Sequence, residues 1–298
     1  MRPMEVVDDR GRKYKLPHPP RRIVSLVPSD TYTLSKLGGA GLLVGRTRYC
    51  VEPAEVARVE EVGGTKDPDV DRIIALAPDL VLMNKEENTE RAVERLEEAR
   101  IRAFVTFPRR LEDGIALVSR LARMLGDPTP ETKAIVRDTY RAKQAIEARP
   151  ADAPRLRVFV PIWMDPLMTV HADTYISAVL AALGADNVFA DRRRAYPLAA
   201  DLGEAAPTDS AKLEGRDTRY PRVTMAEVES RAPDVILLPS EPHAFSEADR
   251  AAFLSTNTPA AKSGRVHLVD GRDLMWPGLR SLDGLDRLRA ILWPAANA

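Results

Sequence analysis

The side chains that could bind a small molecule gather just after segments that we expect to form strands. Two of the three tryptophans, Trp163 and Trp276, stand in such positions, as do Tyr49 and His243. Aromatic residues make up only 5% of the 298 residues. Aromatic rings offer flat apolar faces, so this placement favours a flat or macrocyclic ligand. The alternative is that the tryptophans fill a core between two lobes.

Charged side chains accompany these aromatic residues. Lys66, Lys85 and Arg280 could meet anionic groups of a ligand, because fixed cations attract anions and arginine binds carboxylates through two hydrogen bonds. Glu86 lies in a polar run, 84–88, whose simplest role is to place acids near the positive end of a following helix. The alternative is that Glu86 is a general acid. Glu241 precedes His243 in a second polar loop.

Patterns typical of catalysis are absent. The chain has no phosphate-binding G-x-x-x-x-G-K-[ST], no G-x-S-x-G nucleophile turn and no H-E-x-x-H. None of the four histidines stands at metal-ligand spacing from another. Cys50, the single cysteine, could be a small buried residue, a nucleophile or an axial ligand. We therefore assign no catalytic and no metal-ligating residue.

Composition excludes several classes of protein. Lys plus Arg and Asp plus Glu both number 44, so no excess positive charge points to nucleic acid. No stretch of about 18 apolar residues is present to cross a membrane. The pattern of the N-terminal residues is not the one expected of a secretory leader. We expect a cytoplasmic protein as the sequence stands, or a periplasmic or cell-surface one if a leader has been removed.

Short apolar runs alternate with helical patterns along the chain. Strands are expected at 22–27, 42–45, 80–83, 101–107, 155–160, 187–189, 235–238 and 266–269. Helices are expected at 31–37, 70–76, 89–99, 111–125, 130–148, 174–183, 223–231, 245–254 and 281–292. This alternation predicts an α/β fold of two Rossmann-like lobes with mainly parallel sheets. The expected domains are an N-terminal lobe, 1–126, a connecting backbone helix, 127–150, and a C-terminal lobe, 151–298.

One junction occurs twice. In both 76–82 and 231–237, a helix is expected to end at Ala-Pro-Asp and a strand to follow. The two lobes therefore share a structural unit.

Several segments in this order resemble the periplasmic binding proteins with a rigid helical backbone, also called class III or helical-backbone metal receptors. The segments are 6–12, 16–17, 22–29, 43–50, 62–69 and 73–81, of which the helix–strand junction at 73–81 is the most characteristic. The resemblance covers nearly the whole chain. Members of this family deliver cobalamin, haem and iron–siderophore chelates to ABC importers, and some relatives lack a leader.

The resemblance implies two lobes joined by one long helix, with a ligand held between them. It places Tyr49 where cobalamin binders offer a tyrosine, and Trp163 and Trp276 in ligand-lining loops. Asn84 stands where cobalamin binders have a tryptophan, and Thr65 or Lys66 where another aromatic residue is expected.

The resemblance also bears on partners. Asp71 keeps the acidic residue expected for docking to an importer on the first lobe, whereas Met275 replaces its counterpart on the second. The expected partners are therefore a small metal chelate and an ABC importer through Asp71, with no nucleic acid and no membrane insertion.

We therefore expect a non-enzymatic protein that binds a metal chelate, as a solute-binding or cofactor-handling protein. The chelate would be cobalamin-like, haem or a ferric siderophore, and no other cofactor is assigned. The predicted ligand-binding residues are Tyr49, Lys66, Lys85, Glu86, Trp163, Glu241, His243, Trp276 and Arg280. The alternative is a cytosolic enzyme that uses the same cleft, with Glu86 and His243 as acid and base.

Overall fold

The computed structural model describes residues 4–148, 150, 152–209 and 213–294, which form two compact units. Unit 1 holds the chain up to Pro108, Glu112–Gln144 and Trp276–Leu282. Unit 2 holds Arg109–Leu111, Ala145–Met275 and the residues from Asp283 onward. The segment of unit 1 near the C-terminus is therefore the third that the chain contributes to it.

Unit 1 is built on a four-stranded parallel sheet of order β4-β3-β5-β6. Its strands are β3 (Ile23–Ser25), β4 (Leu43–Arg46), β5 (Leu80–Asn84) and β6 (Ala103–Thr106). An antiparallel hairpin of β1 (Met4–Val7) and β2 (Lys13–Leu16) accompanies it. The helices are α1 (Pro28–Leu34), α2 (Val70–Ala75), α3 (Glu90–Glu98), α4 (Leu111–Met124) and α5 (Pro130–Glu147).

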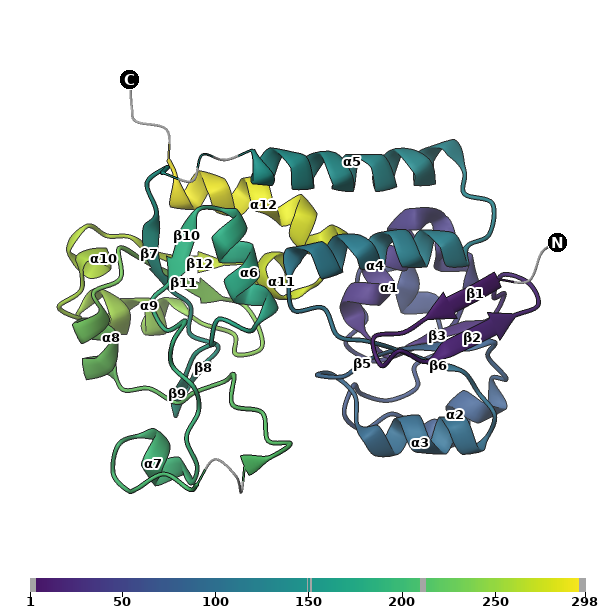
Figure 1. The fold of residues 1–298 in the computed structure, drawn as a ribbon, viewed down its shortest axis with the longest axis horizontal. Coiled ribbons are helices and arrows are strands. Elements are labelled where there is room, and N and C mark those ends of the chain that lie inside the picture. Colours follow the sequence, from purple (N-terminus) through teal and green to yellow (C-terminus); the bar gives the residue numbers. More distant parts are fainter. Residues whose placement is uncertain (1–3, 149, 151, 210–212, 295–298) are drawn as a thin grey trace. The chain divides into compact units, whose positions relative to one another are not determined.

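Alternation along the strands explains the layers of unit 1. Val24, Val81 and Met83 share a buried cluster with residues of α2 and α3 such as Ile73 and Leu96. Successive side chains of a strand point to opposite faces. The intervening buried residues therefore face the other side of the sheet, where α1 and α4 lie (Figure 1).

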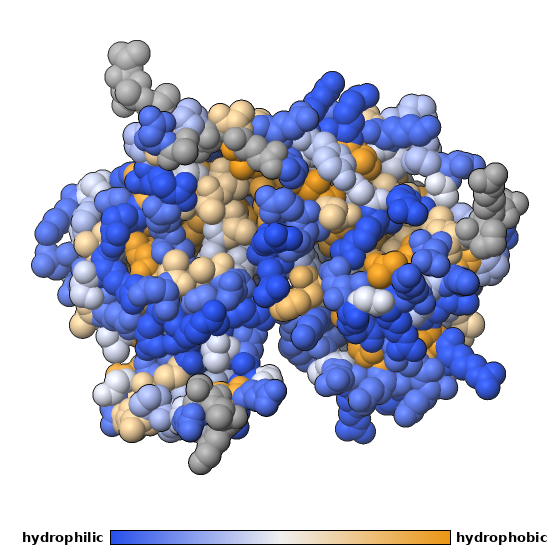
Figure 2. All heavy atoms as spheres, viewed as in Figure 1, coloured by the Kyte–Doolittle hydropathy of each residue, from blue (hydrophilic) through white to orange (hydrophobic). Residues whose placement is uncertain are grey.

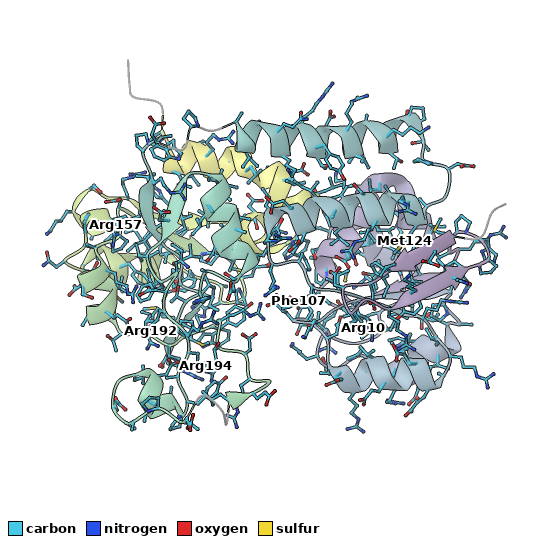
Figure 3. All side chains as sticks on the ribbon, viewed as in Figure 1. Arg10, Phe107, Met124, Arg157, Arg192 and Arg194 are labelled. Carbon is cyan, nitrogen blue, oxygen red and sulfur yellow. The ribbon has the colours of Figure 1, made fainter. Side chains whose placement is uncertain are left out.

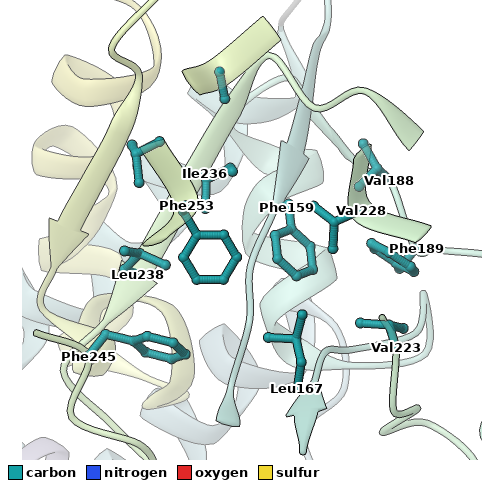
Figure 4. Packing of buried hydrophobic residues seen from close by; sticks show 12 residues of the cluster. Phe159, Leu167, Val188, Phe189, Val223, Val228, Ile236, Leu238, Phe245 and Phe253 are labelled. Carbon is teal, nitrogen blue, oxygen red and sulfur yellow. The ribbon is translucent and has the colours of Figure 1, made fainter. Parts of the chain in front are cut away.

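Unit 2 has a second four-stranded parallel sheet, of order β10-β7-β11-β12. Its strands are β7 (Leu156–Phe159), β10 (Ala185–Asn187), β11 (Val235–Pro239) and β12 (Val266–Val269), beside a short hairpin of β8 (Trp163–Met164) and β9 (Leu167–Met168). The helices are α6 (Tyr175–Ala182), α7 (Leu198–Asp201), α8 (Met225–Arg231), α9 (Glu247–Leu254), α10 (Pro259–Lys262), α11 (Gly271–Met275) and α12 (Leu279–Leu292), the first four residues of α12 belonging to unit 1. Four phenylalanines form much of its core (Figure 4): Phe159, Phe189, Phe245 and Phe253.

The repeated Ala-Pro-Asp junction has the same geometry in both units. Ala77 and Ala232 adopt left-handed backbone angles, with φ of 45° and 44°, as each helix ends. The following aspartate accepts a hydrogen bond from a backbone amide at the start of a neighbouring strand or just before it: Arg22 N to Asp79 Oδ2 at 3.0 Å, and Arg157 N to Asp234 Oδ2 at 2.9 Å.

Each of those arginines also reaches back to the end of the helix. Arg22 Nη2 donates to Leu76 O at 2.7 Å, and Arg157 Nη2 donates to Arg231 O at 2.6 Å. The sequence repeat is therefore a repeated helix–strand clamp.

The α/β class, the two lobes and the parallel sheets are confirmed, and some element bounds differ. The helix expected at 31–37 begins at Pro28 and continues after Leu34 as a wider π-type turn, Ser35–Gly39. Proline suits the first helical turn because its missing N–H has no partner there. The strand expected at 187–189 lies at Ala185–Asn187, since Phe189 packs in the core beyond the end of the ladder.

Hydrophilic residues cover most of the face shown in Figure 2. Among the residues that the structure describes, no helix has both the length and the apolar character needed to cross a membrane.

Candidate functional site

The short hairpin of unit 2 presents two different faces. Trp163 pairs with Met168, and Met164 pairs with Leu167. Met168 also forms a single antiparallel bridge with Arg222 on its other side. Directly opposed residues lie on the same face of an antiparallel pair. Trp163, Met168 and Arg222 therefore share one face, which we call the Trp163 face.

The opposite face of the hairpin belongs to the core. Leu167 and Val223 belong to the buried cluster of Figure 4, and Met164 packs against this cluster. This packing fixes the direction of the hairpin, because a shift of one residue would turn its apolar side chains away from the core. Trp163 is left 44% exposed.

Trp163 is held in place while its ring stays accessible. Its indole Nε1 donates a hydrogen bond to Asp165 O at 3.0 Å. The His243 ring lies 5.5 Å from the Trp163 ring at 61°, an edge-to-face arrangement, and 4.6 Å from Phe245. Two of the predicted ligand-binding residues, Trp163 and His243, are thus in contact.

His243 and Glu241 come from the loop that follows β11. His243 Nε2 lies 3.9 Å from Asp249 Oδ2, an ion pair when the imidazole is protonated. Glu241 is half-buried. Its backbone lies so close to Gly271 that a Cβ there would stand 2.9 Å from Glu241 N. Gly271 therefore allows α11 to begin against this loop.

In unit 1, Tyr49 follows β4 and is 51% exposed. The Arg48 guanidinium lies 5.9 Å from the centre of the Tyr49 ring. Tyr49 therefore has an accessible ring beside a cation, and it lies in a loop after a strand, as predicted.

Lys66, Lys85 and Glu86 also lie at the carboxyl ends of the strands of unit 1. Lys66 Nζ donates to the backbone oxygen of Glu86, so the structure brings these two residues together. The Lys85 ammonium lies 5.2 Å from the centre of the Phe107 ring. Both lysine side chains are exposed.

Two buried asparagines of the polar run 84–88, Asn84 and Asn88, hold this loop. Asn84 Oδ1 accepts from Glu86 N at 2.7 Å, and Asn88 Oδ1 accepts from Asn84 N at 2.8 Å. Asn88 Nδ2 donates to Thr65 O at 2.9 Å. Asn88 thereby ties the Lys85–Glu86 loop to the turn that carries Lys66.

Trp276 and Arg280 also belong to unit 1 and meet at Tyr32. The Trp276 and Tyr32 ring centres are 6.5 Å apart at 68°, and the Arg280 guanidinium lies 5.9 Å from the Tyr32 ring. Trp276 is 8% exposed, in contrast to Trp163. Tyr32 was missed because its position within an expected helix gave no sign of this contact.

Cys50 is a buried structural residue. Its sulfur lies 3.1 Å from the hydroxyl oxygens of Thr31 and Thr47. Burial raises the pKa of the thiol, which disfavours the thiolate needed for nucleophilic attack. In the described part of the chain, no three His, Cys, Asp or Glu side chains group where they could hold a metal ion.

The chain is similar in sequence and in fold to known binding proteins. The chain is 26% identical to a vitamin B12-binding protein of Vibrio parahaemolyticus over 90% of this chain and 87% of that one. It superposes on a periplasmic vitamin B12 binding protein of Vibrio cholerae with a TM-score of 0.73 and 20% identity, over 93% of this chain and 98% of that one.

A haem-binding protein shares the fold as well. The chain superposes on a periplasmic haem binding protein from Pseudomonas aeruginosa with a TM-score of 0.70 and 24% identity, over 93% of this chain and 94% of that one. The family model described as "Periplasmic binding protein" matches residues 23–272, which include both parallel sheets. The chain therefore belongs to the periplasmic binding protein family.

Proposed function

We propose that this protein binds a metal chelate of the corrinoid, haem or ferric siderophore kind, as a solute-binding or cofactor-handling protein. The observation that carries the proposal is the Trp163 face, an exposed aromatic surface fixed by a core-packed hairpin, in a chain of this family. Similarity to proteins named for binding vitamin B12 and haem supports the class of ligand.

Aromatic and cationic side chains would make the proposed contacts. Trp163 and Tyr49 would meet the apolar face of the chelate, since both rings are accessible. Lys66 and Lys85 would meet its anionic groups. The remaining proposed contacts are those of the sequence prediction: Glu86, Glu241, His243, Trp276 and Arg280.

Copurification tests this proposal without a choice of ligand. We expect native mass spectrometry of the purified protein to show a bound small molecule, released on denaturation, with the visible absorption of a metal chelate. A protein that emerges without any such ligand, and takes up none from a cell extract rich in cobalamin and haem, would count against the proposal.

Replacing Trp163 with alanine should weaken chelate binding by about 2 kcal/mol, or roughly 30-fold, because aromatic anchors carry much of the energy of a binding surface. Isothermal titration with the copurified chelate measures this effect. Tyr140→Ala is the matched control, as Tyr140 is 46% exposed on α5 and outside the proposed contacts. Equal losses in the two variants would remove Trp163 from the site.

An ABC importer is the proposed partner, with Asp71 as the docking residue of unit 1. The Asp71 side chain is 81% exposed and pairs with Arg95 at 2.6 Å. The enzyme alternative gains no support from the comparisons, since the matched relatives are named for binding and not for a reaction.

A further inference from the structure

A carboxyl group of α1 is buried away from any hydrogen-bond donor. Asp30, the third residue of α1, is 1% exposed, and neither of its side-chain oxygens accepts a hydrogen bond from the residues that the structure describes. A buried polar group without a partner costs free energy, so each one in a native structure calls for an explanation. Asp30 is not among the proposed ligand contacts.

Arg120, on α4, has a buried nitrogen in the same condition. Its Nε donates to no acceptor in the described part of the chain. The other two nitrogens of the guanidinium serve Asp9: Nη1 donates to Asp9 Oδ1 at 2.6 Å, and Nη2 donates to Asp9 Oδ2 at 3.3 Å. The guanidinium carbon lies 5.5 Å from the centre of the Phe104 ring. Arg120 therefore holds one carboxylate and keeps one buried donor unused.

Asp9 lies in the turn between β1 and β2, residues 8–12, which we call the hairpin turn. Asp9 Oδ2 accepts from Phe107 N at 2.6 Å, and Asp9 N donates to Val105 O at 2.9 Å. Figure 3 labels Phe107, which follows β6. β6 is an edge strand of the unit 1 sheet, so these contacts use backbone groups that the sheet itself leaves open. The pair of Arg120 and Asp9 therefore helps to hold the hairpin turn against this edge.

The groups that act on Asp30 come from its own helix and from three other elements. Burial has the largest effect and raises the pKa of the Asp30 carboxyl to about 7. Arg120 on α4 and the hydroxyl of Ser29 favour the charged form, whereas Asp9 in the hairpin turn and Glu87 after β5 disfavour it. Arg120 thus lies under the influence of two carboxyl groups, of which one is buried and lacks a donor.

We propose that Arg120 is shared between Asp9 and Asp30, and that it holds the hairpin turn firmly only while Asp30 is protonated. An ionised carboxylate inside a protein needs a donor, and Arg120 is a cation that acts on Asp30 and has a buried N–H unused. Turning the guanidinium toward Asp30 draws Nη1 and Nη2 away from Asp9. The hairpin turn would then loosen from β6 as pH rises through about 7, with no ligand involved.

Amide hydrogen exchange of the unmodified protein and of Asp30→Asn, compared at the same pH, tests this inference. At one pH the intrinsic exchange rates of the Asp9 and Phe107 amides are the same in both proteins, since the substitution is distant in the chain. At pH 5 we expect equal rates at these two amides. At pH 8 we expect exchange about tenfold faster in the unmodified protein, because a charge-assisted hydrogen bond is lost there.

Arg120→Gln distinguishes this local effect from a general loss of stability. Without the arginine, the Asp9 and Phe107 amides should exchange quickly at both pH values, and adding Asp30→Asn should no longer slow them. A general destabilisation by the buried Asp30 charge would persist in Arg120→Gln, because the arginine is not its cause. The two amides should also exchange faster than those of β5, since the opening is local.

Asp138→Asn is the matched control. Asp138 lies on α5, and its side chain is 61% exposed and pairs with Arg141 at 3.2 Å. This variant should exchange like the unmodified protein at both pH values. Circular dichroism checks that each variant folds. If Arg120→Gln does not fold, Asp9→Asn takes its place, because it removes the other member of the ion pair and should likewise abolish the response to Asp30.

Two results would overturn the inference. One is equal exchange of the Asp9 and Phe107 amides in the unmodified protein and in Asp30→Asn at pH 8. The other is a difference that persists when Arg120 is replaced by glutamine. All of these measurements are made without a chelate, so their outcome is separate from that of the proposed function.

Discussion

Replacing Trp276 with alanine is expected to lower the free energy of unfolding by about 3–5 kcal/mol, the range for removing a buried tryptophan. Trp276 is 8% exposed and lies edge-to-face with Tyr32. Beside it, the Leu279 backbone N donates to Thr33 Oγ1 at 3.2 Å. Trp276 therefore helps to fasten the C-terminal segment Trp276–Leu282 to the rest of unit 1.

Urea unfolding followed by circular dichroism measures this loss. Trp163→Ala is the matched control, because it removes the same side chain from a position that is 44% exposed and should alter stability by less than about 1 kcal/mol. Similar stabilities for the two variants would contradict the difference in burial. Titrating chelate into folded Trp276→Ala protein also tests Trp276 as a ligand contact.

Asp30 is expected to make the protein less stable as pH rises from about 4 to about 7. Asp30 lies in the first turn of α1 and is 1% exposed. Burial raises the pKa of its carboxyl from 3.8 to about 7, against the opposing charge of Arg120. Between these two pKa values the folded protein holds a proton that the unfolded chain has released.

The sign of the pH effect follows from this difference. Where the folded state binds more protons, the free energy of unfolding falls as pH rises. The total fall across this window is about 4 kcal/mol, from a shift of about three pH units. Above pH 7 the charged carboxylate is buried in the folded protein, and below pH 4 both states are protonated.

Asp30→Asn should remove this dependence. The variant should nearly match the unmodified protein at pH 4 and be more stable at pH 8, by about the amount of the titration. Urea unfolding at pH 4, 5, 6, 7 and 8 measures the two curves. Parallel curves for the two proteins would show that Asp30 does not titrate in this range.

The alternation of strands and helices could be predicted because it rests on local patterns. Buried parallel strands such as β5 are apolar up to their last residue, Asn84, and α3 has a charged exposed side and an apolar buried side. The Ala-Pro-Asp junction could be predicted for the same reason, because it is a short motif that occurs twice in the sequence. The domain boundaries at 126 and 150 stay a prediction.

The hairpin that carries Trp163 could not be predicted. β8 and β9 have two residues each, which is too short for any periodic pattern, and their third partner is Arg222, far along the chain. The sequence also could not show that Trp276 is buried whereas Trp163 is exposed, because sequence position does not show which face a side chain occupies. Such long-range pairings determine which side chains lie together at the site, but they leave no pattern in the local sequence.

Absorbance titration with cyanocobalamin, haemin and the ferric siderophore ferrichrome tests the central claim most directly. Binding of a metal chelate predicts a saturable change in the visible spectrum for at least one of the three, at one equivalent of chelate and weakened in Trp163→Ala. Spectra that remain the sum of free chelate and free protein for all three would contradict the account.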